Sequence, residues 1–549
     1  MTEATLTSIR GQPVLILKEG TSRSRGKEAQ RANITAAKLV AESVRSTLGP
    51  KGMDKMLVDS LGDITITNDG ATVLKEMDVQ HPAAKMIVEV AKTTDSEVGD
   101  GTTSVAVLTG KLLERAEGLL DQKIHSTIIV DGYRDATEKA IEFLNAIAIK
   151  VSPTEKEMLK KVAMTSMAGK LISESKEYLA DLAVDAVMKI VRKTEEGYKV
   201  DIDDIKVDKK AGGSIGETSL IEGLILDKEV VHSSMPKRVE NAHILLVNAP
   251  FEIEKTEFSA KINIEKPEEM KAFLNEEEHM LKAMADKVVA VGADVLICQK
   301  GIDDVIQYYL AKKGVLAVRR ATESNMTKLS KATGAKVVAN IEGLSSKDLG
   351  HAKLVEERKV GGDKWIFIEG CKNPLSVDIL IRGGTDKVVE EAERSIHDAL
   401  CVIRDLVQRP YVVAGGGAPE AETASRLRKW AEKLPGKEQL AALSFANAME
   451  VIPMTLAENA GLDSVNILVA LRARHEKGDV WAGVDALEGK VNDMAKLDVY
   501  EPLVVKEQIV KSASEAACMI IRVDDVIASG KTAGGPSPPR SPMGGEESE

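Results

Sequence analysis

The chain has 549 residues, which is enough for three or four domains, each with its own large hydrophobic core. Acidic residues outnumber basic residues by 86 to 74, and the net charge is −12. This acidic balance, together with an aromatic content of only 3%, argues against a nucleic-acid-binding protein. Hydrophobic residues make up 43% of the chain and charged residues 29%, which is typical of folded globular domains.

We expect a cytoplasmic protein with no membrane-spanning segment. Residues 1–10 lack the apolar stretch of a signal peptide, and no run of 18 apolar residues is present. The cysteines form no CxxC pair, so their spacing predicts neither a zinc site nor a disulfide framework; they are Cys298, Cys371, Cys401 and Cys518. Free thiols in a reducing compartment are the simplest interpretation.

The first 150 residues predict a mostly helical segment. A helical pattern over 34–48 follows Asn33, which is a suitable N-cap residue. The pattern ends at Gly49-Pro50, because proline cannot continue the hydrogen-bond ladder of a helix. Three further helices are predicted in this segment, over 82–96, 102–120 and 133–149.

A hairpin is predicted between the first two helices. Residues 63–67 alternate between polar and apolar side chains, as in a half-buried strand. The turn signal Asn68-Asp69-Gly70 follows directly. We therefore expect residues 71–79 to form the return strand.

The middle of the chain changes character. Short apolar runs of strand length alternate with helical patterns, and this alternation predicts an α/β domain. The predicted strands are 244–247, 295–297, 315–318, 336–338, 365–369 and 377–381, and the predicted helices are 267–291, 303–313 and 323–333.

The last third returns to helical patterns, over 386–407, over 419–434 and within 499–521. From residue 528 onward Gly, Pro and Ser dominate, so we expect a disordered tail. A helical start, an α/β middle and a helical end are compatible with one domain inserted into another.

The strongest local signal for chemistry is Gly99-Asp100-Gly101-Thr102-Thr103-Ser104. The two glycines allow a ligand to approach the backbone closely, and three hydroxyl side chains follow at the start of a helix. A helix N-terminus favours phosphate, but Asp100 would repel it unless a cation such as Mg²⁺ lies between them. An ordinary turn with a threonine cap explains the same residues about equally well.

Two other loops and one acidic residue are weaker candidates. Residues 47–52 end a helix with two glycines, and residues 415–420 place three glycines and a proline at a helix start. A plain loop and a flexible joint are the alternatives. Asp398 lies within a predicted helix, where it is either a solvated side chain or a group that orients an attacking water. Gly530-Lys531-Thr532 lacks the upstream glycine of a P-loop, so we reject it as a phosphate site.

Together these segments resemble the group II chaperonin family, in particular its archaeal thermosome members. The matching motifs are long and occur in the order that the family has, and the resemblance covers roughly residues 10–528. They are residues 47–56, 67–72, 99–103, 415–417 and 456–463.

The resemblance implies a multi-domain α and α/β chaperonin fold. Its parts are a mostly helical equatorial domain built from both ends of the chain, a small intermediate domain, and an inserted α/β apical domain that bears a helical protrusion, the lid. The implied boundaries are 1–151 and 415–528 for the equatorial domain, 152–219 and 380–414 for the intermediate domain, 220–379 for the apical domain with its lid at about 251–289, and 529–549 for the disordered tail.

The resemblance also implies roles for single residues. Asp398 would be the hydrolytic carboxylate with Asp69 as its acidic partner, and Asp100 would hold Mg²⁺. The implied nucleotide-binding residues are Leu48, Gly49, Pro50, Gly101, Thr102, Thr103, Ser104, Lys170, Gly416 and Asp485. The sequence departs from the family pattern at His397, where an acidic residue is common, and at residues 171–173 after Lys170.

The function that the resemblance implies is ATP-dependent chaperone activity, with ATP and Mg²⁺ as cofactors. Unfolded proteins would be enclosed in a double-ring cavity closed by the built-in lid. Eight or nine identical or paralogous subunits would form each ring, with no nucleic-acid or membrane partner. Two other classes stay open: a small-molecule phosphotransferase that uses the same ATP site, and a scaffold protein in which ATP only controls assembly.

Overall fold

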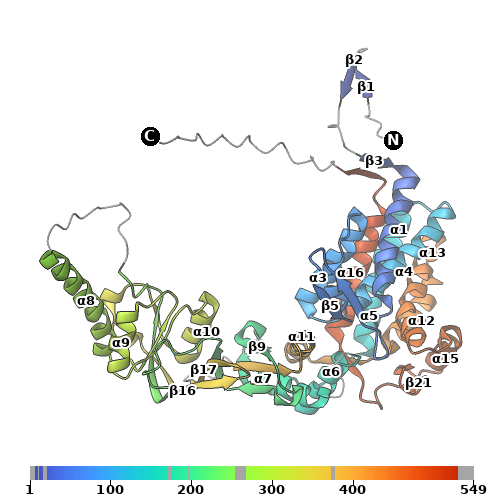
Figure 1. Ribbon diagram of the computed structural model, residues 1–549. Helices are drawn as coiled ribbons and strands as arrows, with labels where there is room; N and C mark the ends of the chain where they lie inside the picture. The colour runs from blue at the N-terminus through green and yellow to red at the C-terminus, as the bar shows by residue number, and fades with distance from the viewer. Residues whose placement is uncertain are drawn as a thin grey trace.

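A computed structural model gives the structure of residues 6–9, 12–15, 22–169, 175–195, 197–253, 267–371 and 377–528. The molecule is curved, with a helical body at one end and an α/β unit at the other, joined by a narrower connecting unit (Figure 1). The blue start and the red end of the chain both lie in the helical body, whereas the green and yellow middle forms the α/β unit.

The helical body is built from two separate stretches of the chain. Its central helix α4 packs against α1 on one side and against α16 on another, so the early and late parts of the sequence share one core. Its helices are α1 (Gly26–Arg45), α2 (Gly70–Glu76), α3 (Pro82–Val98), α4 (Thr102–Asp121), α5 (Ser126–Ile147), α12 (Ala418–Ala431), α13 (Gly436–Met449), α14 (Val451–Asn459), α15 (Ser464–Glu476) and α16 (Leu503–Ile521).

Short sheets tie the two stretches of the helical body together. Near the ends of the described chain, Arg25 of β3 pairs with Asp525 of β23 in an antiparallel ladder. The central strand β19 pairs with both β6 and β22. The strands of this body are β3 (Ser22–Arg25), β4 (Lys55–Val58), β5 (Ile64–Thr67), β6 (Ile149–Lys150), β19 (Tyr411–Ala414), β20 (Ala482–Asp485), β21 (Lys490–Asp493), β22 (Tyr500–Pro502) and β23 (Asp525–Ala528); a separate hairpin, β1 (Leu6–Ile9) and β2 (Gln12–Leu15), precedes them.

The connecting unit also combines two stretches of the chain. Its long helix α11 packs against α6 and α7, and its sheet places β18 between β9 and β10. Its elements are α6 (Lys156–Ser166), α7 (Lys176–Ile190), β7 (Arg192–Thr194), β8 (Gly197–Lys199), β9 (Ile205–Ala211), β10 (Ser219–Ile221), β18 (Val377–Gly383) and α11 (Asp386–Gln408).

The α/β unit has a separate hydrophobic core, formed by residues between Leu224 and Ile368. Its main sheet runs in the order β11-β17-β16-β12-β13-β14, with β12, β13 and β14 parallel and β15 beside β12. This mixed sheet with its helices agrees with the α/β pattern of the sequence. The elements are β11 (Gly223–Leu226), β12 (Arg238–Val247), α8 (Pro267–Ala290), β13 (Val295–Cys298), α9 (Asp304–Lys312), β14 (Leu316–Val318), α10 (Glu323–Thr333), β15 (Val337–Val338), β16 (Gly350–Val360) and β17 (Asp363–Cys371).

Two local predictions in the first segment are wrong. Residues 71–79 do not form the return strand of a hairpin: α2 begins at Gly70, and β5 pairs instead with the preceding strand β4. The reason is that Asp69 acts as the N-cap of α2, accepting hydrogen bonds from the backbone N–H groups of Ala71 and Thr72. Asn33 is not an N-cap, since α1 already begins at Gly26 and Asn33 is buried within it.

One segment has the length and the average composition of a membrane-spanning helix, although it is not an uninterrupted apolar run. Residues Gly436–Asn459, which form α13 and α14, contain an 18-residue window with a mean hydropathy of 1.4. That window is 72% buried inside the structure, and α13 packs against α4, α5 and α12. Such burial is what a core helix of a large helical body requires, so the segment needs no membrane to cover it.

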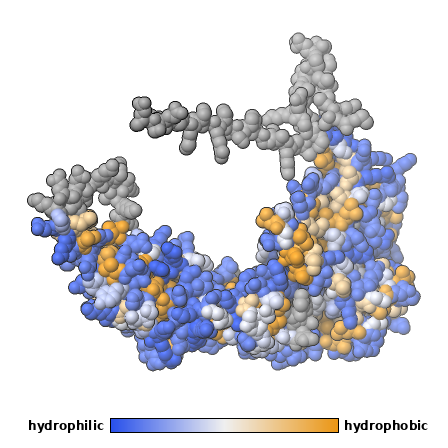
Figure 2. All heavy atoms as spheres, in the orientation of Figure 1, coloured by the Kyte–Doolittle hydropathy of each residue, from blue (hydrophilic) through white to orange (hydrophobic). Residues whose placement is uncertain are grey.

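The predicted lid region is described in part. Residues 254–266 and the predicted tail 529–549 lie outside the described residues, whereas α8 is described. In its first half Met270, Phe273 and Leu274 are about half exposed, and Figure 2 shows apolar surface where α8 lies. In its second half Leu281 and Val288 are buried in the core of the α/β unit.

Candidate functional site

A cavity of about 700 Å³ lies where the helical body meets the connecting unit. It is lined by residues from several separate stretches of the chain, between Thr47 and Lys506. Every predicted site residue except Lys170, which lies outside the described residues, is on its wall: Leu48, Gly49, Pro50, Asp69, Asp100, Gly101, Thr102, Thr103, Ser104, Asp398, Gly416 and Asp485.

The Gly99–Ser104 motif forms a tight loop between α3 and α4. Gly99 and Gly101 both have left-handed backbone conformations, with φ of 67° and 79°, which glycine adopts without steric cost. A Cβ atom on Gly101 would lie 2.6 Å from Cδ1 of Ile509, so the loop has no room for a larger residue there. Thr102, Thr103 and Ser104 are buried in the first turn of α4, where backbone N–H groups lack partners within the helix.

Asp69 stands beside this loop at the start of α2. The Thr102 hydroxyl donates a hydrogen bond of 3.2 Å to Asp69 Oδ1. A Cβ atom on Gly70 would overlap the side chain of Thr103, so glycine is needed for the two helix starts to approach each other. The structure therefore brings the carboxylate of Asp69 and the hydroxyls of α4 to the same end of the cavity.

Asp398 reaches the cavity from α11, in the connecting unit. It is buried, and it lines the same cavity as Asp69 and Asp100. The residue before it, His397, points toward Cys401, which lies one turn further along α11. The distance between His397 Nε2 and Cys401 Sγ is 3.6 Å. Burial raises the pKa of the Cys401 thiol to about 12, so this thiol stays protonated at neutral pH.

The loop of three glycines and Asp485 form another part of the wall. Gly416 and Gly417 have φ of 65° and 75°, and Gly417 is the N-cap residue of α12. The N–H of Val484 donates to the carbonyl of Gly416 at 2.8 Å, which joins the loop to β20. Asp485 Oδ1 accepts two hydrogen bonds from backbone N–H groups of the turn that follows it. The donors are Leu487 at 3.1 Å and Glu488 at 3.0 Å. The carboxylate of Asp485 thus also closes the β20–β21 turn.

A buried charged group at the cavity could not be found from the sequence. Lys506 on α16 is 4% exposed, and its Nζ lies 2.9 Å from Glu420 Oε1 and 2.6 Å from Glu501 Oε2. Burial raises the pKa of Glu501 although Lys506 opposes this change. Glu420 is about 80 residues away in the sequence from Glu501 and Lys506, and no shared motif links it to them, so only the tertiary packing reveals this group.

Two contacts link the helical body to the connecting unit at the cavity. Lys161 of α6 pairs with Asp498, which follows β21, at 2.8 Å, and both residues line the cavity. Asn68 Nδ2 donates a hydrogen bond of 2.6 Å to the carbonyl of Gly169. The sequence carries no signal for either pairing, because the partners are distant in the chain.

The cavity offers Mg²⁺ only a partial coordination shell. Within the part of the chain that the structure describes, no cluster of three or more His, Cys, Asp or Glu side chains is arranged to hold a metal ion. Asp100 contributes a carboxylate next to a helix start. Because Mg²⁺ is commonly held by one or two carboxylates together with phosphate oxygens and water, these residues fit an ion that arrives with a phosphate ligand.

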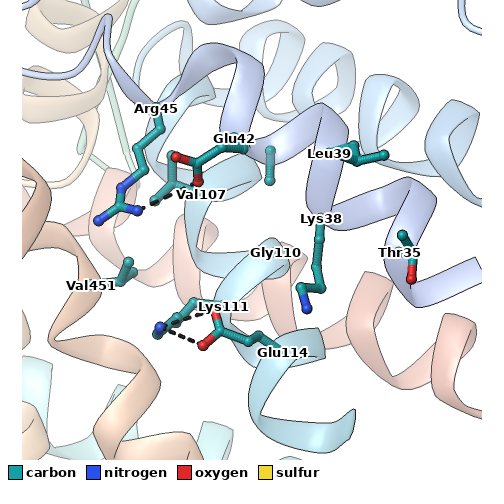
Figure 3. Close-up of a pocket in the computed structure, with 11 residues that line it drawn as sticks. Thr35, Lys38, Leu39, Glu42, Arg45, Val107, Gly110, Lys111, Glu114 and Val451 are labelled. Atoms are coloured by element: carbon teal, nitrogen blue, oxygen red, sulfur yellow. Dashed lines mark hydrogen bonds and ion pairs between the residues drawn. The ribbon is translucent and has the colours of Figure 1, made fainter. Parts of the chain in front are cut away.

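A second, smaller cavity of about 330 Å³ lies between α1 and α4 (Figure 3). Its charged side chains are paired: Lys111 with Glu114 at 2.8 Å, Lys38 with Glu117 at 2.9 Å, and Arg45 with both Glu42 and Glu458. None of the predicted site residues lines it. The larger cavity is therefore the candidate functional site.

The fold and the cavity define a multi-domain protein in which the candidate ligand site lies between a split helical body and a split connecting unit, while none of the described residues of the inserted α/β unit lies on its wall. Residues 40–531 match the TCP-1/cpn60 chaperonin family, and the chain belongs to this family. The predicted family and chaperonin fold are thereby confirmed, and the match supports a role as a chaperone.

The chain is similar to several archaeal proteins along nearly all of its length. It is 59% identical over 523 residues to thermosome subunit beta of Archaeoglobus fulgidus, covering 95% of this chain and 96% of that protein. It is 55% identical over 542 residues to thermosome subunit alpha of the same organism, covering 99% of each. Among solved structures, the open state monomer of a group II chaperonin from Methanococcoides burtonii matches with a TM-score of 0.60 and 45% identity, covering 78% of this chain and 100% of that chain.

Proposed function

We propose that the chain is an ATP-hydrolysing chaperone subunit that uses Mg²⁺ and encloses unfolded proteins. The observation that carries this proposal is the convergence of a glycine-and-hydroxyl helix start with three acidic residues, Asp69, Asp100 and Asp398, around one cavity. A helix start with unpaired N–H groups binds phosphate, and acidic side chains suit a metal ion and an attacking water.

The phosphate end of the site is formed by the loop at the start of α4. The N–H groups and hydroxyls of Thr102, Thr103 and Ser104 would bind phosphate oxygens, helped by the positive end of the helix dipole. Leu48, Gly49 and Pro50 would approach the phosphates from the opposite loop. When bound, Mg²⁺ would neutralise part of the phosphate charge, and Asp100 would be its protein ligand.

The hydrolytic step would depend on two acidic residues from different units. Asp398 on α11 would accept the proton of the attacking water, and Asp69 would orient that water from the other side. Because α11 belongs to the connecting unit and α4 to the helical body, movement between these units would bring Asp398 to the phosphates or take it away. Lys170 would sense the terminal phosphate, and Gly416 and Asp485 would hold the nucleoside end.

The coupling to substrate proteins would use the three domains expected from the sequence. We propose equatorial (1–151, 415–528), intermediate (152–219, 380–414) and apical (220–379) domains, with a lid at about 251–289 whose described helix α8 exposes apolar side chains in its first half. ATP drives closure only if it binds the closed state more tightly than the open state.

The assembly would be two stacked rings of eight or nine subunits in the cytoplasm. The existence of thermosome subunits alpha and beta in one organism supports rings of identical or paralogous subunits.

Substitution of Asp398 tests the proposed function. In Asp398→Asn the site keeps its shape but loses the proton acceptor, so we expect ATP affinity within a few-fold of normal and hydrolysis reduced by about 100-fold or more. Steady-state turnover and calorimetric ATP binding measure the two effects. Asp386→Asn, at the exposed start of the same helix, is the matched control and should hydrolyse ATP normally.

Refolding of a chemically denatured enzyme completes this test. Recovery that needs both ATP and an intact Asp398 supports a chaperone driven by hydrolysis. Normal ATP turnover by the Asp398→Asn variant contradicts the catalytic assignment. Recovery no better than spontaneous refolding, with ATP still hydrolysed by the unsubstituted protein, contradicts the chaperone cycle and favours a phosphotransferase or a scaffold.

A further inference from the structure

Helix α11 of the connecting unit lies directly on the loop between α3 and α4, and the tightest contact joins Cys401 to Gly99. Cys401 is buried, and it lies one turn after Asp398 on α11. A Cβ atom on Gly99 would overlap both Cβ and Sγ of Cys401. Glycine at position 99 is therefore needed for two reasons: its left-handed backbone, and the space that it leaves for α11.

A hydrogen bond from Arg404 fixes the next turn of α11 to the end of α3. Its Nη2 donates to the backbone carbonyl of Glu97 at 2.6 Å, and its Nε donates to Asp405 Oδ1 at 2.7 Å. The last carbonyl groups of a helix lack partners within that helix, and they favour a nearby cation. The last turn of α3 contains no basic residue. Arg404 therefore caps α3 from another unit of the molecule.

These contacts hold α11 close to Asp398. Cys401 follows Asp398 by three residues, so the two side chains lie on the same face of the helix. On the other side of Asp398, the hydroxyl of Thr67 on β5 donates to Glu391 Oε2 at 3.2 Å. Asp398 thus lies between two points at which α11 contacts the helical body. Of these, the contact at Cys401 is the one made with the proposed phosphate loop.

We propose that Cys401 and Arg404 are positioning residues for hydrolysis, and that together they dock α11 on the phosphate loop and fix how closely Asp398 approaches the terminal phosphate. The inference rests on the proposed ATP-hydrolysing function. Cys401 acts through its size, because a bulkier side chain cannot approach Gly99 as closely. Arg404 acts through its hydrogen bond to Glu97. A displacement of a reacting group by about 1 Å can lower a rate by about 100-fold.

The first test is Cys401→Leu in the assembled full-length protein. The bulkier side chain should push α11 away from the loop. We expect the single-turnover rate of ATP hydrolysis at saturating ATP to fall by about tenfold or more. The dissociation constant of ADP, measured by calorimetry, should stay within about twofold, because the loop itself is unchanged. Cys518→Leu, the same substitution at a buried position of α16, is the matched control and should hydrolyse ATP normally.

Arg404 provides an independent pair of variants if Cys401→Leu does not assemble. Arg404→Gln removes the cation from the end of α3, and it should also slow hydrolysis by about tenfold with ADP affinity unchanged. Arg404→Lys keeps a cation that can donate to the Glu97 carbonyl, so it should hydrolyse ATP at least about threefold faster than Arg404→Gln. Arg134→Gln, at an exposed position of α5, is the control and should hydrolyse ATP normally.

The results separate the positioning role from the proposed function. Normal hydrolysis in Cys401→Leu or in Arg404→Gln would overturn the positioning role. A loss of ADP affinity as large as the loss of rate would also overturn it, because the substitution would then have damaged the binding loop. Failure of the unsubstituted protein to hydrolyse ATP would instead overturn the proposed function on which the inference rests.

Discussion

Asp405, near the end of α11, offers a direct test of how burial controls charge next to the candidate site. Its Oδ1 accepts a hydrogen bond of 2.7 Å from Nε of Arg404, but its buried Oδ2 has no hydrogen-bond partner among the described residues. Burial raises the pKa of the Asp405 carboxyl from 3.8 to about 6, although Arg404 opposes this change. The ionised carboxylate is thus destabilised in the folded state.

The pH dependence follows from the two pKa values. Between about pH 3.8 and pH 6 the folded protein binds more protons at Asp405 than the unfolded chain does, so stability decreases as the pH rises through this window. The difference of about two pH units corresponds to about 3 kcal/mol at neutral pH. Asn cannot ionise, so we expect Asp405→Asn to raise the free energy of unfolding by about 3 kcal/mol at pH 7.5 and by about half of that at pH 5.

Urea unfolding followed by tryptophan fluorescence measures this effect, since Trp430 and Trp481 pack against the same hydrophobic core as α11. Asp135→Asn, at an exposed position of α5 in the same helical body, is the control and should change the free energy of unfolding by less than about 0.5 kcal/mol. The reasoning is refuted if Asp405→Asn gives no stabilisation at pH 7.5, or a stabilisation that is equally large at pH 5.

Two further substitutions test the geometry of the cavity. Gly101→Ala forces a side chain into a backbone with φ of 79° and to within 2.6 Å of Ile509, so ATP affinity measured by calorimetry should fall by about tenfold. Gly118→Ala, within the helix α4 that Gly101 caps, meets open space and should leave ATP affinity unchanged. Equal losses of affinity in the two variants would contradict a local effect at Gly101. Lys506→Met leaves the buried carboxylate of Glu420 and the partly buried carboxylate of Glu501 without their cation, so urea unfolding should show a loss of about 3 kcal/mol. A loss below about 1 kcal/mol would contradict the role of Lys506.

Much of the candidate site could be predicted because its binding elements are contiguous in the sequence. The loop over 99–104 and the loop over 415–417 combine glycines with a helix start, and each can be identified from a few adjacent residues. The resemblance to group II chaperonins then selected Asp69 and Asp398 from many acidic residues. The structure places these residues around one cavity, while their individual roles and the domain boundaries stay predictions.

The remaining features depend on contacts between distant parts of the chain. Lys161 meets Asp498, and Arg404 meets the carbonyl of Glu97, only after the fold has formed, and no local pattern distinguishes them from solvated charges. The error at residues 71–79 has a local cause, because the same Asp-Gly pair that favours a hairpin turn also caps a helix. In this chain the helix forms instead of the hairpin, and α2 packs against α3.

The split helical body has a consequence for the synthesis of the protein. Helix α4 ends at Asp121, but its partner α16 begins only at Leu503, about 380 residues later. At about 5–20 residues per second, a ribosome needs roughly 20–75 s to make the missing half of this core. During that time the nascent chain presents the apolar face of α4 without its final cover. The α/β unit, whose core lies within residues 224–368, can close earlier. A member of a chaperone family is therefore itself exposed to aggregation until the last helix leaves the ribosome.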